Sequence, residues 1–373
     1  MENVLIYSDS IANSEYTPTH PFKPVRARFF LELLNRYHRN DYFSVLSPER
    51  LDEELLYLFH DEWYIDLLKR ADRGEFTVEM LYAGLGTADN PLFRGMFDLM
   101  LKIAGGTYAG AKLLLNGKAR CVFSPISGLH HAERNRASGF CYVNDIAIAG
   151  AALVREGRRI ACVDIDAHHG NGVQDAFYAS DRVLTISVHE SGETLFPGSG
   201  NETEIGEGAG VGYNVNIPLK AGTDDEVYVY AFDAIVPQLL EQFAPEIVFM
   251  QIGGDCHRDD PLAHLNVTSN GYKSVVGTVN SLSPRILAMG GGGYNVFKTA
   301  ALWVLAWSTL TGVKPEDKFA GLVGGMMYGP EMEAGSLEDL PFASEPQEKD
   351  ACFSEAERVV EQLRKTVFPL HGL

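Results

Sequence analysis

The sequence predicts an α/β protein of three layers, in which helices cover both faces of a central parallel sheet. Short apolar runs recur along the chain, and each ends in glycine or polar residues. The runs are Cys121–Phe123, Ile160–Val163, Val183–Val188, Ile247–Ile252 and Arg285–Met289. Helical patterns lie between them, at about Asn144–Arg155, Asp224–Phe243 and Tyr272–Asn280. Continuous apolar strands that alternate with helices are typical of a parallel sheet that is buried on both faces.

The part of the chain before these runs is predicted to begin with a strand and continue mostly as helices. The strand is Val4–Tyr7, and the helices are at about Val25–Arg39, Asp52–Phe59, Glu62–Ala71 and Phe97–Leu115. Gly84–Pro91 is predicted to be a loop, because glycine, aspartate, asparagine and proline crowd it. The pair Gly105-Gly106 indicates either close packing or a break in the helix that contains it.

After a last core helix near Phe297–Leu310, the region Pro330–Asp350 is rich in glutamate, proline and glycine and is predicted to be loose. A helix is then expected from Ser354, because Glu357 follows three residues later in a capping-box pattern. No repeat or long linker divides the chain. We therefore expect one domain over residues 1–373, with a looser C-terminal extension from about residue 330.

The composition favours some classes of function and argues against others. The chain has 373 residues, 46% hydrophobic and 22% charged, which is typical of a globular protein. The formal charge of −19 argues against direct nucleic-acid binding, which needs clustered lysine and arginine. The five cysteines form no C-x-x-C pair, which favours reduced thiols. With no evident signal peptide and no apolar run near the ~18 residues of a membrane span, we expect a cytoplasmic protein.

The stretch Ile160–Gly172, IACVDIDAHHGNG, concentrates metal-ligand residue types directly after a buried strand. The alternation of side chains along a strand could direct Asp164, Asp166 and His168 toward one point. Two carboxylates and an imidazole suit a divalent cation. The alternative is a strand end with solvated charges, but aspartate and histidine are poor strand residues. The pattern favours a metal or catalytic site.

Similar residues follow the other predicted strands. They are His130 and His131, His189, Asp255, and Tyr294 after a four-glycine turn. A single histidine is more often a hydrogen-bonded structural residue than a ligand. However, ligands of open parallel sheets bind beyond the carboxyl ends of the strands, and five such ends carry these residues. The sequence therefore predicts one site shared by five strand ends.

The motifs at these strand ends resemble those of the histone deacetylase superfamily. The similarity is greatest to bacterial class I-like members, the acetoin-utilization deacetylases, and runs from about His20 (in THPFKP) to Trp307. It implies the arginase–deacetylase fold and metal-dependent removal of acetyl from an N-acetyl-lysine-type amine. The motifs, in chain order, are ISGLHH, SGFCYVND, VDIDAHHGNGV, FPGSG, QIGGD and GGGGYN.

The resemblance assigns a role to each catalytic position. It implies a catalytic metal, Zn²⁺ or Fe²⁺, on Asp166, His168 and Asp255. Three protein ligands leave open positions, as catalytic metal sites require. It implies that His131 is the general base and later protonates the leaving amine, with His130 as its electrostatic neighbour. Asp164 would be the partner of His130, and Tyr294 the hydroxyl that stabilises the oxyanion.

The resemblance also implies a substrate tunnel and monovalent cation sites, with K⁺ as the expected ion. One wall of the tunnel would be formed by Gly139 and Phe140 and the other by Phe196. Asp89 would hold the substrate backbone at the rim. Gly292 would let the protein backbone approach the acetyl group. Arg26 either lines an inner acetate cavity or is a solvated helix residue. The inner cation site would comprise Asp164, Asp166, His168, Ser187 and Val188, and the outer one Phe177, Ser180, Val183 and Tyr213.

One position departs from the family pattern. Many class I enzymes pair the base with an aspartate, whereas this chain has Asn171. An amide can orient His131 but adds no negative charge, so it favours the imidazolium less than a carboxylate would. The imidazole of His169 looks structural, or at most a neighbour of the metal ligands.

Three other functions are weighed against a protein deacetylase. A binuclear ureohydrolase such as arginase needs D-x-H-x-D and D-x-D, but Gly170 and His257 stand where the second metal needs carboxylates. An acetylpolyamine amidohydrolase would perform the same chemistry on a small cationic amine. A non-catalytic acetyl-lysine binder would have lost a ligand, the base or the tyrosine, and all of these are present. The expected substrate is thus acetylated lysine on a protein or a small acetylated amine.

Overall fold

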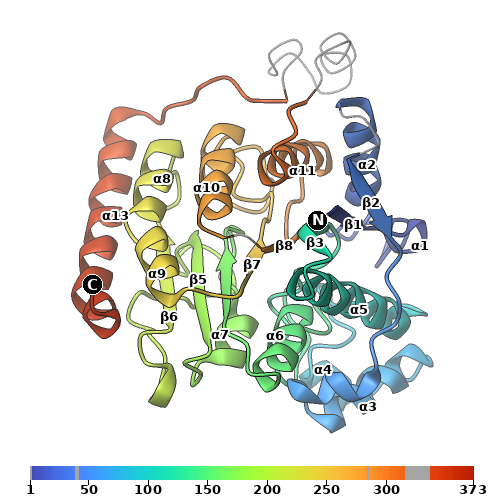
Figure 1. Cartoon of the computed structure of the whole chain (residues 1–373). Helices are drawn as coiled ribbons and strands as arrows, with labels where there is room; N and C mark the ends of the chain where they lie inside the picture. Colours follow the sequence, from blue (N-terminus) through green and yellow to red (C-terminus); the bar gives the residue numbers. More distant parts are fainter. Residues whose placement is uncertain (1, 38–41, 284, 316–336) are drawn as a thin grey trace.

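The central layer of the protein is one eight-stranded sheet in which every neighbouring pair is parallel (Figure 1). The structure is a computed structural model and describes residues 2–37, 42–283, 285–315 and 337–373. The strand order is β2-β1-β3-β8-β7-β4-β5-β6. The strands are β1 (Glu2–Ile6), β2 (Phe43–Leu46), β3 (Ala119–Ser124), β4 (Ile160–Asp164), β5 (Val183–Glu190), β6 (Asn214–Leu219), β7 (Ile247–Gln251) and β8 (Ile286–Met289).

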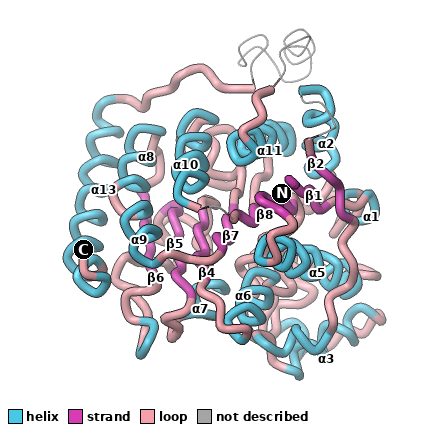
Figure 2. The backbone as a smooth tube through the Cα atoms, in the orientation of Figure 1, coloured by secondary structure: helices cyan, strands magenta, loops and turns pink. Residues whose placement is uncertain are grey.

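Helices cover both faces of the sheet, which confirms the predicted three layers (Figure 2). Successive residues of a strand point to opposite faces, so Leu5 of β1 joins one core while Val4 and Ile6 join the other. One face packs against α2 (Arg26–Tyr37), α8 (Asp225–Asp233), α9 (Val236–Phe243), α10 (Ser269–Leu282), α11 (Val296–Thr311) and α13 (Pro346–Thr366). The other packs against α5 (Met96–Leu115), α6 (Asp145–Arg155) and α7 (Asn171–Phe177).

Four short elements from the first part of the chain build a lobe beside the sheet, with its own buried cluster around Tyr64 and Tyr142. They are α1 (Asp9–Ala12), η1 (Glu53–Leu58), α3 (Glu62–Asp72) and α4 (Val78–Tyr82). The segment predicted as a helix at Asp52–Phe59 forms the 3₁₀ helix η1. The Gly105-Gly106 pair marks close packing, because a Cβ on Gly105 would lie 2.0 Å from the carbonyl oxygen of Glu49.

All six strands expected from apolar runs are present, but two further strands were not predicted. Both are at the edges of the sheet. In β2 all four residues retain some exposure, and in β6 the residues Asn214, Asn216 and Pro218 interrupt the apolar pattern. An edge strand needs fewer apolar residues and tolerates proline, because only one of its sides is paired.

Two helix predictions were wrong in their bounds. The continuous helix expected at Asp224–Phe243 is split into α8 and α9, because Pro237 has no amide hydrogen to donate to the preceding turn. The last helix, α13, begins at Pro346 rather than at Ser354, which lies inside it. Proline is well suited to a first helical turn, where no intrahelical amide donor is required.

The region predicted to be loose, Pro330–Asp350, is described only in part. Residues 330–336 lie outside the described residues, residues 337–345 form no helix and no strand of the sheet, and Pro346–Asp350 are helical. The carboxylate of Asp339 anchors this segment, because it accepts hydrogen bonds from the imidazole of His257 at 2.9 Å and the amide of Ser269 at 2.9 Å.

The arrangement of the sheet gathers the suspected functional residues at one edge. Strands β3, β8, β7, β4 and β5 are consecutive neighbours, and all five run in the same direction. Their carboxyl ends therefore meet at one edge of the sheet, as expected for an α/β ligand site. In the described part of the chain, no helix combines the length and the apolarity needed to cross a membrane.

Candidate active site

Three predicted ligands converge at the carboxyl ends of β4 and β7. Asp166 and His168 follow β4, and Asp255 follows β7. Their potential ligand atoms all lie within 4.8 Å of one another, and all three residues are buried. Nδ1 of His168 is 2.9 Å from Oδ2 of Asp255 and 3.2 Å from Oδ1 of Asp166. The structure thus brings together the three residues that the resemblance implied as metal ligands, whereas Asp164, which the strand pattern grouped with Asp166 and His168, pairs with His130.

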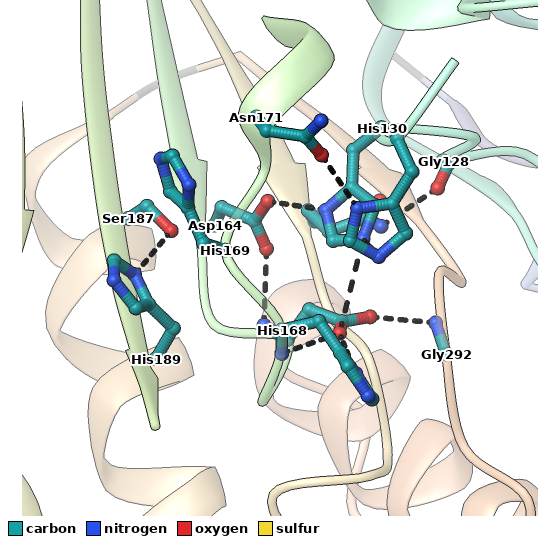
Figure 3. Close-up of polar contacts among 12 residues, drawn as sticks. Gly128, His130, Asp164, His168, His169, Asn171, Ser187, His189 and Gly292 are labelled. Atoms are coloured by element: carbon teal, nitrogen blue, oxygen red, sulfur yellow. Dashed lines mark hydrogen bonds and ion pairs between the residues drawn. The ribbon is translucent and has the colours of Figure 1, made fainter. Parts of the chain in front are cut away.

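The chemistry of this group suits a divalent cation. Burial alone would lower the pKa of His168, but its hydrogen bonds to Asp166 and Asp255 outweigh burial and raise the pKa to about 10. The two carboxylates therefore favour positive charge at Nδ1, which a cation can supply in place of a proton. The amide of Gly292 donates to Oδ2 of Asp166 at 2.6 Å, which orients that carboxylate (Figure 3).

A pair of histidines lies beside the metal group, and each ring has a fixed partner (Figure 3). His130 donates from Nδ1 to Oδ2 of Asp164 at 2.7 Å. His131 donates from Nδ1 to Oδ1 of Asn171 at 2.8 Å. The two Nε2 atoms are 2.9 Å apart, so one ring donates to the other. The pairing of His131 with Asn171, expected from the sequence, is present.

The surroundings shift the pKa values of the two rings in opposite directions. Burial opposes charge on His130, but Asp164 and Asp166 outweigh it and raise the pKa of His130 above its usual value. Burial and the neighbouring His130 and His168 hold the pKa of His131 well below its usual range. His130 therefore carries the shared proton, while the neutral His131 has a lone pair on Nε2.

The hydroxyl of Tyr294 stays protonated near the metal group. Burial, together with the negative charges of Asp255 and Asp166, raises the pKa of Tyr294 well above its usual value. The ring centroid lies 6.1 Å from that of His168, and the amide of Tyr294 donates to Asp260 at 2.7 Å. The residue can therefore act as a neutral hydrogen-bond donor beside the site.

Two aromatic side chains pack against residues of the site. The ring of Phe196 is 5.0 Å from that of His131, and its side chain is 44% exposed. Phe140 packs against Tyr294 at 5.7 Å. Phe196 thus lies against His131 and Phe140 against Tyr294, at the positions where the resemblance implied the walls of a substrate tunnel. Asp89 lies in an exposed loop, and its backbone carbonyl accepts a hydrogen bond from His20 at 3.0 Å.

The turn that carries Phe140 is tight and strained. Ser138 and Cys141 exchange two backbone hydrogen bonds of 3.0 and 2.9 Å, with Gly139 at φ 52° and Phe140 at φ 70° between them. Both positive angles match a type I′ turn, in which the second central position normally holds glycine. Gly139 is required for a further reason, because a Cβ there would lie 2.4 Å from the ring of His131. The hydroxyl of Tyr16 donates to the carbonyl of Phe140 at 3.0 Å.

Arg26 is fully buried, so its interpretation as a solvated helix residue was wrong. Its guanidinium reaches under the glycine turn, donating from Nη1 to the carbonyl of Gly293 at 2.8 Å and from Nη2 to that of Gly291. Its Nε atom has no partner among the described residues. The arginine is thus directed toward the interior behind Tyr294.

The residues expected to hold monovalent cations fall into two places. Asp164 ends β4 and is in register with Ser187 of β5, beside the metal group. Ser187 is 2.8 Å from Nδ1 of His189 (Figure 3). The Nε2 atom of His189 donates to the carbonyl of Gly200. Since Nε2 carries the proton of a neutral His189, the hydroxyl of Ser187 donates to Nδ1 and keeps its lone pairs free. Val188 follows in β5, and Asp166 and His168 follow β4.

The residues of the outer cation site lie near the amino ends of two strands. Phe177 ends α7 and accepts a backbone hydrogen bond from Ser180 at 2.9 Å. Val183 is the first residue of β5, and Tyr213 directly precedes β6. These four positions are therefore at the opposite end of the strands from the catalytic residues.

The structure reveals residues that support the histidine pair and that the sequence did not single out. The carboxylate of Asp145 accepts hydrogen bonds from the amides of Gly128 and Leu129, at 3.1 and 2.7 Å, and from Thr107 at 2.6 Å. The side chain of Asn144 donates to the carbonyl of His130 at 3.3 Å. The only sequence signal was the Asn-Asp pair at the start of a helix, which is typical of an N-cap.

Two further polar residues hold the same loop. The side chain of Gln251 donates to the carbonyl of Gly128 at 2.8 Å. His60 accepts a hydrogen bond at Nε2 from the amide of Asn144, 2.9 Å away, and donates from Nδ1 to the carbonyl of Arg134 at 3.2 Å. Nothing in the local sequence of His60 could reveal this contact, because its partners are far away in the chain.

His169 is directed away from the metal group. Its ring lies 2.9 Å from the hydroxyl of Ser199 and 3.1 Å from Oε1 of Gln174, and burial lowers its pKa to about 4. Gln174 Oε1 also accepts from the side-chain amides of Asn214 and Asn216. His169 therefore donates from Nε2 and accepts at Nδ1 from Ser199, so it joins the metal-ligand loop to the segment that follows Phe196.

The comparisons with known proteins agree with this geometry. The model of the histone deacetylase domain matches residues 20–310. The chain is 34% identical to histone deacetylase clr6 of Schizosaccharomyces pombe, over 97% of the chain and 89% of the relative. It is 36% identical to the acetoin utilization protein AcuC of Bacillus subtilis, over 84% of the chain and 83% of the relative.

A solved structure has the same fold. The crystal structure of a histone deacetylase homologue from Aquifex aeolicus superposes with a TM-score of 0.84 at 29% identity, over 96% of this chain and all of that one. The fold is therefore the arginase–deacetylase fold that the motifs implied. From the family match, the relatives and this superposition, it follows that the chain belongs to the histone deacetylase family, as a bacterial-like member, and is a hydrolase that acts on amides.

Proposed function

We propose that this protein is a metal-dependent amidohydrolase that removes acetyl groups from N-acetyl-lysine in proteins. One observation carries the proposal. The buried group of Asp166, His168 and Asp255 lies directly beside a neutral histidine base, His131, and a protonated tyrosine, Tyr294. These are the parts that hydrolysis of an unactivated amide requires.

The three ligands would hold one divalent metal, Zn²⁺ or Fe²⁺, because two carboxylates and an imidazole accept both ions. When bound, it would supply Lewis-acid chemistry, polarising the acetyl carbonyl and acidifying water. A second metal is disfavoured, because a binuclear site needs carboxylates at Gly170 and His257. The imidazole of His257 faces away and bonds Asp339 at 2.9 Å.

The histidine pair would provide the proton transfer and part of the charge stabilisation in the reaction. His131, held by Asn171 through Nδ1, would take a proton from the attacking water at Nε2, once that water replaces His130 as the partner of this nitrogen. The same nitrogen would later give that proton to the leaving amine. The positive charge that Asp164 favours on His130 would help to stabilise the negative charge that develops on the carbonyl oxygen.

Tyr294 would donate its hydroxyl hydrogen to that oxygen. The glycine turn before it brings the backbone close to the metal ligands, since a Cβ on Gly292 would lie 2.0 Å from Oδ2 of Asp255. Arg26, fixed behind this turn by the carbonyls of Gly291 and Gly293, would attract the acetate that the reaction releases.

A passage between Phe140 and Phe196 would suit the methylene stem of lysine, and the exposed Asp89 would hold the substrate backbone at the rim. A monovalent cation, K⁺ by the same resemblance, would bind beside Asp164 and Ser187, and a second near Tyr213. Similarity to a bacterial acetoin utilization protein supports a cytoplasmic location. A small acetylated amine is the alternative substrate, because the same passage would admit it.

The test is a panel of acyl-lysine peptides and acetylated amines, assayed with protein reconstituted with Zn²⁺ or Fe²⁺. We expect turnover of acetyl-lysine peptides, with kcat reduced about 100-fold or more in Tyr294→Phe, as for loss of one oxyanion donor. Tyr230→Phe, remote on α8, is the matched control and should match the wild type. Faster turnover of acetylputrescine than of any peptide would favour the small-amine alternative. Retained activity in Tyr294→Phe would contradict the proposed role of the tyrosine.

A further inference from the structure

The C-terminal helix α13 lies beyond residues 20–310, which the family model matches, yet it contacts the segment that carries Phe196. We propose that Arg358 of α13 is a positioning residue that holds this segment, residues 191–204, in place through Glu202. We call the segment the wall loop, since Phe196 forms one wall of the passage. The inference rests on the proposed function, and it gives the C-terminal helix a part in forming the substrate passage.

The buried carboxylate of Glu202 depends on Arg358 for compensation of its negative charge. Its side chain is only 5% exposed, and Oε1 is 2.6 Å from Nη1 of Arg358. Oε2 is buried and has no hydrogen-bond partner in the described part of the protein. A buried carboxylate is costly unless it is paired, so the contact with Arg358 offsets the burial of Glu202.

Arg358 is itself fixed by its own helix. Nε is 3.0 and 3.1 Å from the two carboxylate oxygens of Glu355, and Nη2 is 2.7 Å from Oε1. The opposite face of α13 is anchored in the core by Cys352, Val359 and Leu363. At the edge of the molecule α13 lies next to α8 (Figure 1). The guanidinium of Arg358 is therefore held in place by α13 where it contacts the wall loop.

A cleft separates the wall loop from the helix around this ion pair. It has a volume of about 690 Å³ and is bordered by Gly198–Glu202 on one side and by Ala351, Ser354 and Glu355 on the other. Glu202 and Arg358 both border it. Glycine and polar residues dominate its lining, so apolar packing contributes little there. The ion pair thus joins the loop to the helix where direct packing does not.

The wall loop is held from the inside as well. The ring of His169 contacts Ser199, and the carboxylate of Glu204 accepts hydrogen bonds from the amides of Gly200 and Asn201 at 3.2 and 2.9 Å. Phe196 then rests against the base, His131. If Arg358 is lost, the unpaired carboxylate of Glu202 gains by moving into the cleft and becoming hydrated. That movement pulls the loop, and with it Phe196, away from the passage.

A purely structural ion pair would behave differently. It would lower the stability of the protein a little, because Arg358 is 51% exposed, and would leave the kinetic constants unchanged. A positioning role instead predicts a selective rise in KM, since Phe196 contacts the substrate stem and does not take part in bond breaking.

The variants Arg358→Gln, Glu202→Gln and the combination of both are compared with Lys365→Gln. Lys365 forms an exposed pair with Glu361 on the same helix, at 3.2 Å, and is the matched control. For Arg358→Gln we expect KM for an acetyl-lysine peptide to rise about fivefold with kcat nearly unchanged. The combined variant should restore KM to within about twofold of the wild type, because no buried charge remains.

A second measurement does not depend on activity. Backbone amide hydrogen exchange within residues 198–204 should be faster in Arg358→Gln than in the wild type and unchanged in Lys365→Gln. If the wild type shows no amidohydrolase activity, the proposed function fails, and the exchange result alone decides the inference. Unchanged exchange in Arg358→Gln overturns the inference, as does a combined variant with a KM no lower than that of Arg358→Gln.

Discussion

Asn171 gives the base a neutral partner in a site that is otherwise rich in carboxylates. Its Oδ1 accepts the Nδ1 hydrogen of His131, which fixes the ring and leaves Nε2 free of protons. Burial and two neighbouring histidines already hold the pKa of His131 low. The amide therefore orients the base without favouring its imidazolium form.

Asn171→Asp is expected to raise the pKa of His131, because a carboxylate at this position stabilises the imidazolium. The base is then protonated over more of the acid range, so the acid limb of the kcat/KM profile shifts to higher pH. The measurement is the pH dependence of kcat/KM for an acetyl-lysine peptide. An identical profile for the variant and the wild type would argue against the pairing.

Asp255→Asn is expected to weaken metal binding by removing one of two anionic ligands. The amide keeps the shape of the side chain but loses its charge. Metal content after dialysis, measured by elemental analysis, should fall well below one ion per chain. The control is Asp175→Asn on the exposed side of α7, which should keep the wild-type content. Two transition ions per wild-type chain would overturn the single-metal proposal.

At this scale the sequence predicts residue types better than their contacts. Asp166, His168 and Asp255 were conspicuous as carboxylates and an imidazole at strand ends, but it was the resemblance that separated them from Asp164 as the ligand set. Arg26 remained ambiguous, because an arginine in an amphipathic helix is usually solvated and only the fold shows that its guanidinium is buried. His60 could not be found, since its role depends on contacts with Asn144 and Arg134, which are distant in the sequence.

Among the elements, the start of α6 has the clearest consequence for stability. His60 accepts the amide of Asn144 and donates to Arg134, so it must be neutral with its hydrogen on Nδ1. Burial is the main reason that its pKa falls to about 4. The same helix start supports the loop of the histidine pair through Asn144, so the stability of this element and the shape of the site are linked.

We expect the free energy of unfolding to fall as the pH drops from about 6.5 to 4. In that range the unfolded chain protonates His60 and the folded protein does not, so protons favour unfolding. The neutral His60 contributes its full stabilisation above pH 6.5, and about 2 kcal/mol of that stabilisation is lost at pH 5. Urea unfolding at pH 7 and pH 5 measures it. In His60→Gln, which has no titratable ring, the loss between these pH values should be smaller by that amount.

Helices and strands with a complete hydrophobic pattern were predicted, whereas the two edge strands and the start of α13 were not. The buried strands show unbroken apolar runs because both of their faces are covered. The edge strands β2 and β6 show mixed patterns because they are paired on one side only. The start of α13 was misplaced because a proline- and glutamate-rich segment resembles a loop when no neighbouring helix is known.

For the molecule as a whole, the metal group joins separate parts of the chain. Asp166 and His168 follow β4 and Asp255 follows β7, so an ion bound by all three connects two neighbouring strands. Without a cation, buried carboxylates remain close together and repel each other. A metal that binds the folded state and not the unfolded chain stabilises the protein, and this stabilisation increases with the free metal concentration.

Chelation is therefore expected to abolish activity and lower the Tm together, and added Zn²⁺ or Fe²⁺ should restore both. At a free metal concentration about 1,000 times Kd, the gain in stability is about 4 kcal/mol. Thermal unfolding followed by calorimetry, with and without chelator, measures the change. Asp255→Asn should show little response to added metal. A Tm that is insensitive to chelation in the wild type would contradict tight binding at this site.

At the scale of the molecule, the sequence predicted the layers but not the order of the strands. Alternating helices and apolar strands indicate a parallel sheet. They do not indicate that β8 lies between β3 and β7, because pairing of parallel strands leaves no local signal. The resemblance of the motifs identified the fold without specifying which strand ends are neighbours.

The position of β8 in the middle of the sheet has a consequence for biosynthesis. Cys121 of β3 pairs with Ile286 of β8, so β3 has only one strand partner until most of the chain has left the ribosome. Such distant pairing is slow to form and leaves an unpaired strand edge exposed in the meantime. A nascent chain that ends before β8 cannot bring the histidine pair, which follows β3, against the ligands that follow β4 and β7. Truncated products would thus expose apolar surface and lack an assembled site, which makes them natural clients of chaperones and proteases.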